Sequence, residues 1–371
     1  MKKPIRVLHV IGKMDRAGAE TLILNIYRNI DRSKIQFDFV VHTNQIGDYD
    51  EEIKELGGKI YHAPNYKIYN KLEYKKFWNN FFNEHSEYKI IHGHIRSSAS
   101  IYLKIAKKHG VYTICHSHNT KGKGIMGKFH QIITRNIPKY TDYFFGCSNQ
   151  AIIDGFGRKV YDKYNHQVLN NGIEAKEYVY DKKIDKKYRK QFNLENSFIV
   201  GHVGRFTAQK NHKYLIDVFK QIKEQEENSK LVLIGRGELE QEVSEYINQK
   251  GLKEDVLLLG VRSDINKLLM MFDAFVFPSI FEGLGIALIE AEAAGLKCFV
   301  SENIQKEAVI SNDVYRLQLS DSPKTWADTI LREAKNYKKQ NNLKLVEKNN
   351  YDIKKITKQI EKFYKDISKK L

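Results

Sequence analysis

The pattern of apolar and polar positions repeats regularly along the first half of the chain. Short apolar runs with the length of buried strands occur at residues 5–11, 37–41, 89–92, 111–115 and 143–147. Between them, residues 19–30 and 97–108 carry apolar side chains at the spacing of an amphipathic helix. This alternation predicts a parallel sheet covered by helices on both faces.

The same alternation starts again in the second half. Apolar runs that predict strands lie at residues 198–203, 231–234, 256–259, 274–277 and 298–301, and helical patterns lie at 212–223, 238–249, 264–271 and 286–294. A length of 371 residues also suits two domains better than one. We therefore expect an α/β protein with two doubly wound, Rossmann-like sheets in tandem.

A turn signal and a charged stretch separate the two patterns. Asn170-Asn171-Gly172 marks a turn, and residues 182–187 are mostly charged. We place the domains at residues 1–168 and 169–345. Residues 346–371 are expected to form a basic C-terminal helix, for which packing back on the N-terminal domain is one option.

Charge and cysteine usage narrow the class of protein. The formal net charge of +17 favours a phosphate-bearing substrate, an anionic membrane surface or nucleic acid as partner. Cys115, Cys147 and Cys298 are scattered, which favours reduced thiols over a disulfide framework or a zinc site. The chain has no run of 18 apolar residues, so the sequence predicts no membrane-spanning helix. We expect a cytoplasmic protein and leave open peripheral contact with the inner face of the membrane.

The strongest chemical signal follows the predicted strand at residues 274–277. Gly283 and Gly285 free the backbone where a helix begins, so that its N–H groups can face an anion. Glu282 and Glu290 lie on either side of this start, and a carboxylate accepts hydrogen bonds from paired sugar hydroxyls well. The competing interpretation is a helix with a charged N-terminal region and one solvated glutamate.

This stretch resembles the E-x7-E signature of retaining glycosyltransferases of the GT-B fold, in particular glycosyltransferase family 4. The resemblance implies that Glu282 contacts the donor sugar near its anomeric centre, that Glu290 binds the nucleotide ribose, and that Gly283, Leu284 and Gly285 contact the donor. It implies two Rossmann-like domains that face each other across a cleft. It also implies transfer, with retention, from a nucleoside diphosphate sugar, in the first place a UDP-sugar, to a hydroxyl of a glycan or lipid-linked acceptor. Surface polysaccharide synthesis without a cofactor or metal is the expected setting.

Other segments of the C-terminal half resemble the same family. The resemblance implies that Arg205 and Lys210 neutralise the donor diphosphate, and fixed cations would stabilise the charge that grows on this leaving group. The alternative is that both are surface cations of a basic chain. Further donor-binding positions implied by the resemblance are Gly235, Arg236 and Val261.

The matching segments of the N-terminal half are looser. Gly18 lies in a loop that resembles the family's Gly-rich loop, although the usual paired glycines are not both present. The family carries a functional histidine at a strand end, and His116 and His118 both fit this place; a structural role is the alternative. No cluster of cysteines or carboxylates accompanies them in the sequence, which argues against a metal site. Asp48 and Asp50 suit the first turn of a helix better than a metal-binding pair.

A basic, aromatic segment suggests where a membrane would be touched. Within residues 66–78, Lys67, Lys71, Lys75 and Lys76 alternate with Tyr66, Tyr69, Tyr74, Phe77 and Trp78. Aromatic rings suit the headgroup zone, and lysines are attracted to an anionic surface. Lys121, Lys123 and Lys128 are expected on the acceptor side of the site. The alternative is that these lysines only keep the protein soluble.

Two other classes of protein were weighed. A nucleic-acid-binding protein would explain the charge, but the chain has no helix-turn-helix, RNA-recognition or zinc-finger pattern, so we expect no nucleic-acid partner. A nucleotide-binding oxidoreductase or epimerase would explain the Rossmann-like pattern. Such an enzyme would carry G-x-G-x-x-G after the first strand, and this chain does not.

Overall fold

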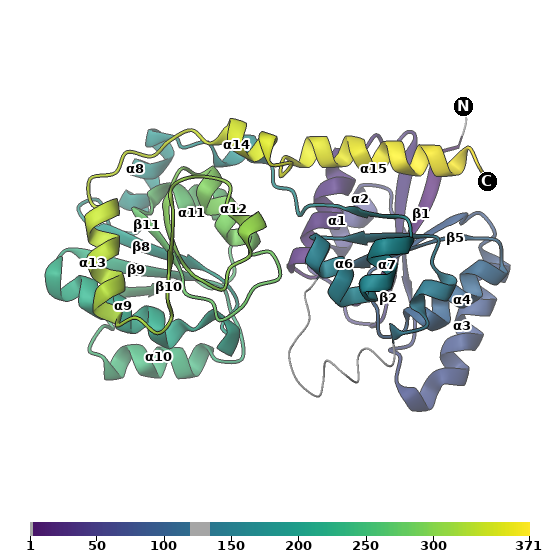
Figure 1. Ribbon diagram of the computed structural model, residues 1–371, viewed down its shortest axis with the longest axis horizontal. Helices are drawn as coiled ribbons and strands as arrows, with labels where there is room; N and C mark the ends of the chain where they lie inside the picture. Colours follow the sequence, from purple (N-terminus) through teal and green to yellow (C-terminus); the bar gives the residue numbers. More distant parts are fainter. Residues whose placement is uncertain (1–2, 119–133) are drawn as a thin grey trace. The chain divides into compact units, whose positions relative to one another are not determined.

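Two parallel sheets, each covered by helices, form the framework of the computed structural model, which describes residues 3–118 and 134–371 (Figure 1). The chain divides into two compact units. One consists of residues 1–173 and 350–371, and the other of residues 174–349. Lys121, Lys123 and Lys128 lie outside the described residues.

The sheet of the first unit has the strand order β3-β2-β1-β4-β5-β6-β7. Its strands are β1 (Ile5–Ile11), β2 (Ile35–Val41), β3 (Ile60–His62), β4 (Ile90–Gly93), β5 (Tyr112–Ser117), β6 (Tyr143–Gly146) and β7 (His166–Val168). Its helices are α1 (Gly18–Asn29), α2 (Asp50–Glu55), α3 (Lys71–Glu84), α4 (Ala99–Lys108), α6 (Asn149–Phe156), α7 (Arg158–Lys163) and α15 (Ile353–Ser368). Short 3-10 helices η1 (Ile68–Asn70) and η2 (Ile137–Tyr140) complete the unit.

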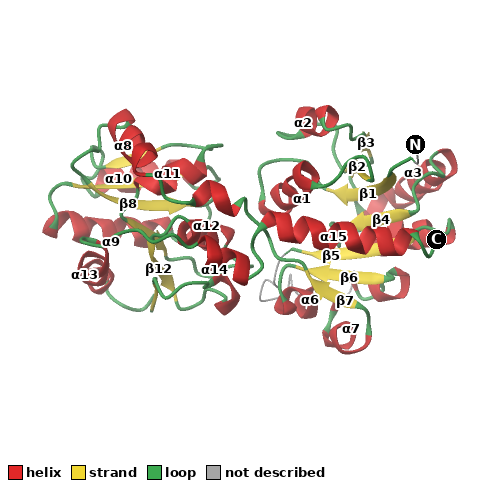
Figure 2. Ribbon diagram, turned by 90° about the horizontal axis from the view of Figure 1, so that it is seen from above, coloured by secondary structure: helices red, strands yellow, loops and turns green. Residues whose placement is uncertain are grey.

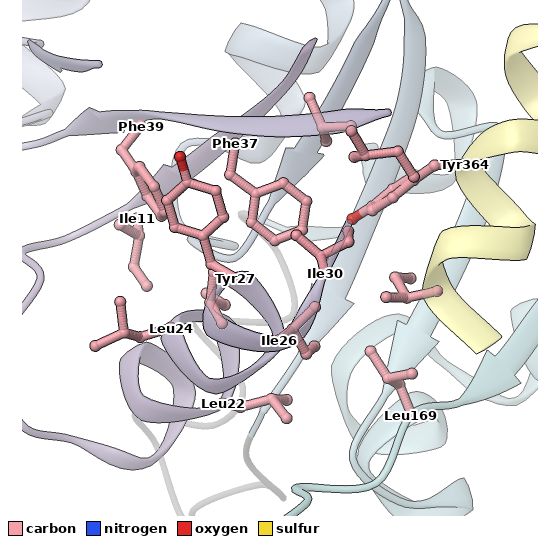
Figure 3. Packing of buried hydrophobic residues seen from close by; sticks show 14 of the residues in the cluster. Ile11, Leu22, Leu24, Ile26, Tyr27, Ile30, Phe37, Phe39, Leu169 and Tyr364 are labelled. Atoms are coloured by element: carbon pink, nitrogen blue, oxygen red, sulfur yellow. The ribbon is translucent and has the colours of Figure 1, made fainter. Parts of the chain in front are cut away.

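Separate apolar clusters cover the two faces of this sheet. On one face, side chains of α1 and α15 pack against β1 and β2, and Figure 3 shows Ile26, Tyr27, Phe37 and Tyr364 in this cluster. On the other face, α3 and α4 bury a cluster that includes Trp78 and Tyr102. Apolar surface on both sides of each central strand explains why these strands read as continuous apolar runs.

Helix α15 is the C-terminal element, and it lies across the sheet of the first unit (Figure 2). Ile353, Ile356, Ile360 and Tyr364 are buried and recur at helical spacing, while lysines occupy the other faces. The chain is anchored just before the helix, because Ile173 N donates to Tyr351 O at 2.8 Å and Ile353 N donates to Ile173 O at 3.0 Å. The basic tail is therefore the polar face of a core helix.

Helix α3 contains most of residues 66–78, the segment whose aromatic side chains were expected to touch a membrane. Tyr74 and Trp78 were expected to face lipid, but both are fully buried on the sheet side of the helix. Their spacing of four residues is that of a helix face. The exposed apolar side chains nearby are Ile68, Tyr69 and Leu72, at 71%, 82% and 82% exposure.

The second unit repeats the architecture with the strand order β10-β9-β8-β11-β12-β13. Its strands are β8 (Phe198–Val203), β9 (Ser229–Ile234), β10 (Val256–Leu258), β11 (Ala274–Phe277), β12 (Lys297–Ser301) and β13 (Val314–Leu317). Its helices are α8 (Lys182–Gln191), α9 (His212–Gln225), α10 (Glu240–Gln249), α11 (Ile265–Met271), α12 (Ile286–Ala293), α13 (Pro323–Ala334) and α14 (Leu343–Lys348). The 3-10 helices are η3 (Ala175–Tyr178), η4 (Ala208–Lys210) and η5 (Lys306–Ala308).

The core of the second unit follows the predicted periodicity. Leu215 and Phe219 of α9, Val243 of α10 and Trp326 of α13 pack in one cluster against the sheet. None of the described helices is long and apolar enough to cross a membrane.

Candidate active site

The carboxyl ends of four neighbouring strands collect most of the predicted donor-binding residues. In the second unit, successive strands run outward in one direction from β8 to β10 and in the other from β11 to β13. The topological switch point therefore lies between β8 and β11, and ligands of open parallel sheets bind at such points. The loops after β8 and β11 carry Lys210 and Glu282.

Lys210 and Glu282 form an ion pair at this point. Lys210 Nζ lies 2.6 Å from Glu282 Oε1, and the two side chains are only 15% and 7% exposed. The Lys210 ammonium also lies 4.4 Å from the centre of the Phe277 ring, a cation–π contact. Glu282 is thus a buried carboxylate that neutralises the lysine in a low-dielectric setting.

One backbone and one side-chain hydrogen bond hold the two loops together. Ile280 N donates to Gln209 O at 2.8 Å, and Gln209 Nε2 donates to Phe281 O at 2.8 Å. Asn211 has φ 55°, a left-handed conformation that asparagine tolerates, and it ends η4 where α9 begins. Lys210 is thus fixed from both sides, and sequence inspection did not single out Gln209 for this role.

The loops after β8 and β9 approach more closely than side chains would allow. Gly235 has φ 138°, and a Cβ atom there would lie 2.1 Å from Gly204 O. Gly204 N donates to Ile234 O at 2.9 Å, and Phe206 N donates to Arg236 O at 3.1 Å. Glycine is required at position 235 for both its dihedral angle and this approach.

Arg205 and Arg236 lie on the exposed side of these loops, and Val261 lies in the loop after the neighbouring strand β10. The Arg205 side chain is 76% exposed and lies 4.0 Å from Glu238. Arg236 is exposed beside Gly260, and Val261 is 53% exposed. Exposed cations and an exposed apolar side chain along one sheet edge could bind phosphates and a flat base, respectively.

Helix α12 starts next to Glu282 and carries Glu290. Gly285 has φ 83° at the N-terminus of the helix, with the Glu282 side chain beside it, and Gly283 and the buried Leu284 form the preceding turn. Tyr178 Oη donates to Glu290 Oε1 at 2.8 Å. Burial raises the pKa of Glu290 to about 7, and the Tyr178 hydrogen bond opposes this shift. Tyr178, on η3, gave no signal in the sequence.

In the first unit the switch point lies between β1 and β4, and histidines gather there. His9 Nδ1 lies 3.0 Å from His94 Nε2, and His94 Nδ1 lies 2.8 Å from His118 Nε2. His116 is 1% exposed and stacks on His118 with ring centres 3.9 Å apart. Burial lowers the pKa of His118 to about 3 and holds that of His116 well below its usual value. Gly18 is the first residue of α1, shortly after β1 in the sequence, and it is exposed.

The sequence signal for this cluster was the repeated H-x-H pattern. His92 on β4 and His116 on β5 are followed by His94 and His118 just beyond the strand ends, and the alternation of side chains places all four on one face of the sheet. Among the described residues, the groups with metal-ligand spacing consist only of histidines from this cluster. The further histidine near His116 and His118 is His94, which comes from the end of the neighbouring strand and was not weighed in the sequence. Asp50 instead accepts a hydrogen bond from Gly47 N at 2.9 Å in the first turn of α2, as expected.

Comparison with known proteins adds to this geometry. The sequence model of the family described as "Glycosyl transferases group 1" matches residues 184–350. The chain is 35% identical over 340 residues to EpsF of Bacillus subtilis (strain 168), whose name describes a glycosyltransferase; the match covers 89% of this chain and 88% of EpsF. It is 24% identical to the capsular polysaccharide biosynthesis glycosyltransferase CapH of Staphylococcus aureus, covering 97% of this chain and 98% of CapH.

A third relative has a printed substrate. The chain is 29% identical, over 63% of its own length and 64% of the relative's, to an Escherichia coli enzyme named UDP-Gal:alpha-D-GlcNAc-diphosphoundecaprenol alpha-1,3-galactosyltransferase.

Solved structures share the fold. Anabaena HepE in complex with UDP and glucose superposes with a TM-score of 0.81 at 18% identity, covering 98% of this chain and 100% of HepE. WaaG, a glycosyltransferase involved in lipopolysaccharide biosynthesis, superposes with a TM-score of 0.70 at 15% identity, covering 96% of this chain and 98% of WaaG. The chain therefore belongs to the glycosyl transferases group 1 family and is a glycosyltransferase with the GT-B fold.

Proposed function

We propose that this glycosyltransferase moves a sugar from a UDP-sugar to a hydroxyl of a lipid-linked acceptor, with retention of the anomeric configuration, during surface polysaccharide synthesis. The observation that carries the proposal is the Lys210–Glu282 pair at the switch point of the second sheet. A buried cation there can meet the charge that develops on a departing diphosphate.

The donor would be held by groups from neighbouring loops. Lys210 and the exposed Arg205 and Arg236 supply positive charge for the diphosphate. Glu282, beside the start of α12, would contact the donor sugar and keep Lys210 in place. Glu290 would accept hydrogen bonds from the ribose hydroxyls, and His116 or His118 would touch the donor sugar from the first unit. Retention rests on the family resemblance.

The names of relatives support the acceptor and the setting. The Escherichia coli relative is named for a UDP-sugar donor and a diphosphoundecaprenol acceptor, and CapH is named for capsular polysaccharide biosynthesis. HepE was solved with UDP. A lipid-linked acceptor requires that the enzyme work at a membrane surface, which for a cytoplasmic enzyme is the inner face.

An exposed patch of the first unit suits that surface. We call Ile68, Tyr69, Leu72 and the exposed lysines Lys67, Lys71, Lys75 and Lys76 the lipid-facing patch. Its apolar side chains can enter the headgroup layer, and each lysine contributes about 1 kcal/mol on an anionic surface. The adjoining Tyr74 and Trp78 anchor the patch to the core.

The proposal is tested by supplying a panel of sugar nucleotides with an undecaprenyl-diphosphate-linked sugar and analysing the product by NMR. We expect turnover with a UDP-sugar, a product anomer with the configuration of the donor, and full activity in EDTA. Turnover only with donors of another base would contradict the UDP assignment, and an inverted product would contradict retention. Activity lost in EDTA and restored by a divalent ion would contradict metal-independent transfer.

A further inference from the structure

Five histidines line one face of the first sheet at its switch point. His9 on β1 is in register with His92 on β4, and His94, His116 and His118 follow on the same face of β4 and β5. Ring stacking connects them, with centres 5.3 Å apart for His9 and His92 and 5.4 Å for His92 and His116. The cluster extends from the interior under α1 and α15 to the carboxyl edge of the sheet.

The imidazoles of this cluster are neutral and partly unpaired. Burial lowers the pKa of His9 and His118 to about 3 and places those of His92, His94 and His116 well below the usual value. His116 Nδ1, His116 Nε2 and His118 Nδ1 are buried without a hydrogen-bond partner among the described residues. Unpaired buried nitrogens are costly, and neutral imidazole nitrogens are metal ligands.

Two groups of three histidines have ligand atoms within 4.8 Å of one another, and they share His94. The inner group, His9 with His92 and His94, borders a cavity of about 10 Å³ that is otherwise lined mainly by apolar side chains such as Leu22 and Ile360. A divalent ion would be poorly solvated there. The outer group, His94 with His116 and His118, lies at the strand ends, where two of its members are partly exposed.

We propose that His94, His116 and His118 bind one divalent transition-metal ion of the class of Zn²⁺, and that an ion bound there inhibits glycosyl transfer. Imidazole nitrogen is a preferred ligand for Zn²⁺, Cu²⁺ and Ni²⁺. Binding is independent of the proposed function. The inhibition rests on it, because the ion would occupy the histidines proposed to touch the donor sugar.

The hydrogen bonds of His94 allow it to bind a metal ion as a neutral imidazole, without releasing a proton. When His94 donates its Nε2 proton to His9 Nδ1, its Nδ1 lone pair faces His118 Nε2. His9 then orients His94 as outer-shell partners orient metal-bound histidines. Zn–N bonds of about 2.0–2.1 Å at tetrahedral angles place ligand nitrogens roughly 3.3 Å apart. The pair now at 2.8 Å therefore opens by about half an ångström to admit the ion.

A charged side chain beside the triad affects which fourth ligand the metal ion would take. Arg96 lies close enough to His118 to lower its pKa further, after burial. Burial lowers the pKa of Arg96 itself, but a guanidinium stays protonated in proteins, so a positive charge lies beside the triad. Three neutral ligands near a cation favour an anionic fourth ligand, such as hydroxide or chloride.

The test uses the full chain without a polyhistidine tag, freed of metal by a chelator, and titrated with ZnCl₂ by calorimetry. We expect one ion per chain, and at least tenfold weaker binding in His94→Gln and in His118→Gln. His62→Gln, which alters an exposed histidine on the far edge strand β3, should bind as wild type does. His116→Gln is avoided because the residue is buried in the sheet.

A thermal melt with and without ZnCl₂ provides a second readout and checks folding. Zn²⁺ should raise the Tm of wild type and His62→Gln, and change that of the two triad variants little. Absence of saturable binding, or wild-type affinity in both triad variants, overturns the site. Zn²⁺ that binds at the triad without slowing an active enzyme overturns the inhibition alone. A chain that binds Zn²⁺ but transfers no sugar contradicts the proposed function and leaves the metal site standing.

Discussion

Lys210 and Glu282 are two buried charges, and each is tolerated in the folded protein because the other neutralises it. Removing one partner of such a pair leaves an uncompensated charge, whereas replacing both by apolar groups can be nearly neutral. A substitution that removes only the glutamate therefore affects stability as well as chemistry. Glu282→Gln, which keeps the shape and a hydrogen-bond acceptor for Lys210, separates the two effects better than Glu282→Ala does.

We expect Glu282→Ala to lower the free energy of unfolding by about 3–5 kcal/mol. The double variant Lys210→Met/Glu282→Leu should recover most of that loss, because no charge is left unpaired. Urea unfolding of wild type, Glu282→Ala, the component variants Lys210→Met and Glu282→Leu, and the double variant measures this. A double variant as unstable as the sum of the singles would show that the two side chains do not interact.

Glu290 should make donor binding depend on pH near neutrality. Its pKa is raised to about 7 in the folded chain, above the unfolded value. The protonated carboxyl therefore predominates below pH 7, and ionisation as pH rises through 7 lowers stability but creates the acceptor that ribose needs. Affinity for a UDP-sugar should rise by up to roughly tenfold from pH 6 to pH 8.

Calorimetry with a UDP-sugar is suited to this prediction, because neither of its phosphates titrates in that range. Glu290→Gln should bind with an affinity that changes little between pH 6 and pH 8. A wild-type affinity that is flat over the same range would contradict the role of Glu290.

At the scale of elements, the crossing of the loops after β8 and β9 depends on Gly235. Gly235→Ala combines a left-handed dihedral angle with a Cβ placed 2.1 Å from Gly204 O. Gly251→Ala is the matched control, since Gly251 has φ 74° but no atom within 4 Å of the added Cβ. The control should lose about 1–2 kcal/mol of stability.

Gly235→Ala should lose more stability than Gly251→Ala, and nucleotide affinity in addition. Thermal melts and UDP titrations of both variants measure these effects. Equal losses of stability and unchanged affinity in both would show that the close approach of the loops is unimportant.

The long elements were predictable from sequence, because their periodicity is local. The predicted strand at residues 198–203 coincides with β8, and that at 274–277 coincides with β11. The edge strands β3, β7 and β13 were missed, since runs of three or four partly polar residues carry little pattern. Helix α3 was read as a surface segment because its lysines dominate the sequence, although Tyr74 and Trp78 already have helical spacing.

The candidate site was predictable in composition but not in its contacts. Position after a strand pointed to Lys210, Gly235 and Glu282, because parallel strands end at a common edge. The pairing of Lys210 with Glu282 and the bond from Tyr178 to Glu290 join positions 72 and 112 residues apart. Such pairings arise only from tertiary packing. The roles of His116 and His118 stay predictions.

At the scale of the whole molecule, the lipid-facing patch predicts binding to anionic vesicles. Ile68→Ser/Leu72→Ser should reduce pelleting with such vesicles, and Lys71→Glu/Lys75→Glu/Lys76→Glu should abolish its dependence on salt. Ile46→Ser is the matched control, because Ile46 is 79% exposed elsewhere in the first unit. Pelleting that is absent at low salt, or that falls equally in the control, would remove the membrane from this account.

The central claim is that sugar transfer by this glycosyltransferase depends on the Lys210–Glu282 ion pair. Its most direct test is kcat for sugar transfer by wild type, Glu282→Gln and Asp217→Asn. Asp217 pairs with Lys250 at the same Nζ–O distance of 2.6 Å in the same unit, but on α9 and away from the strand ends. We predict that Glu282→Gln lowers kcat by about 10²–10³ and that Asp217→Asn transfers sugar at the wild-type rate. A folded Glu282→Gln variant with wild-type kcat would contradict the account.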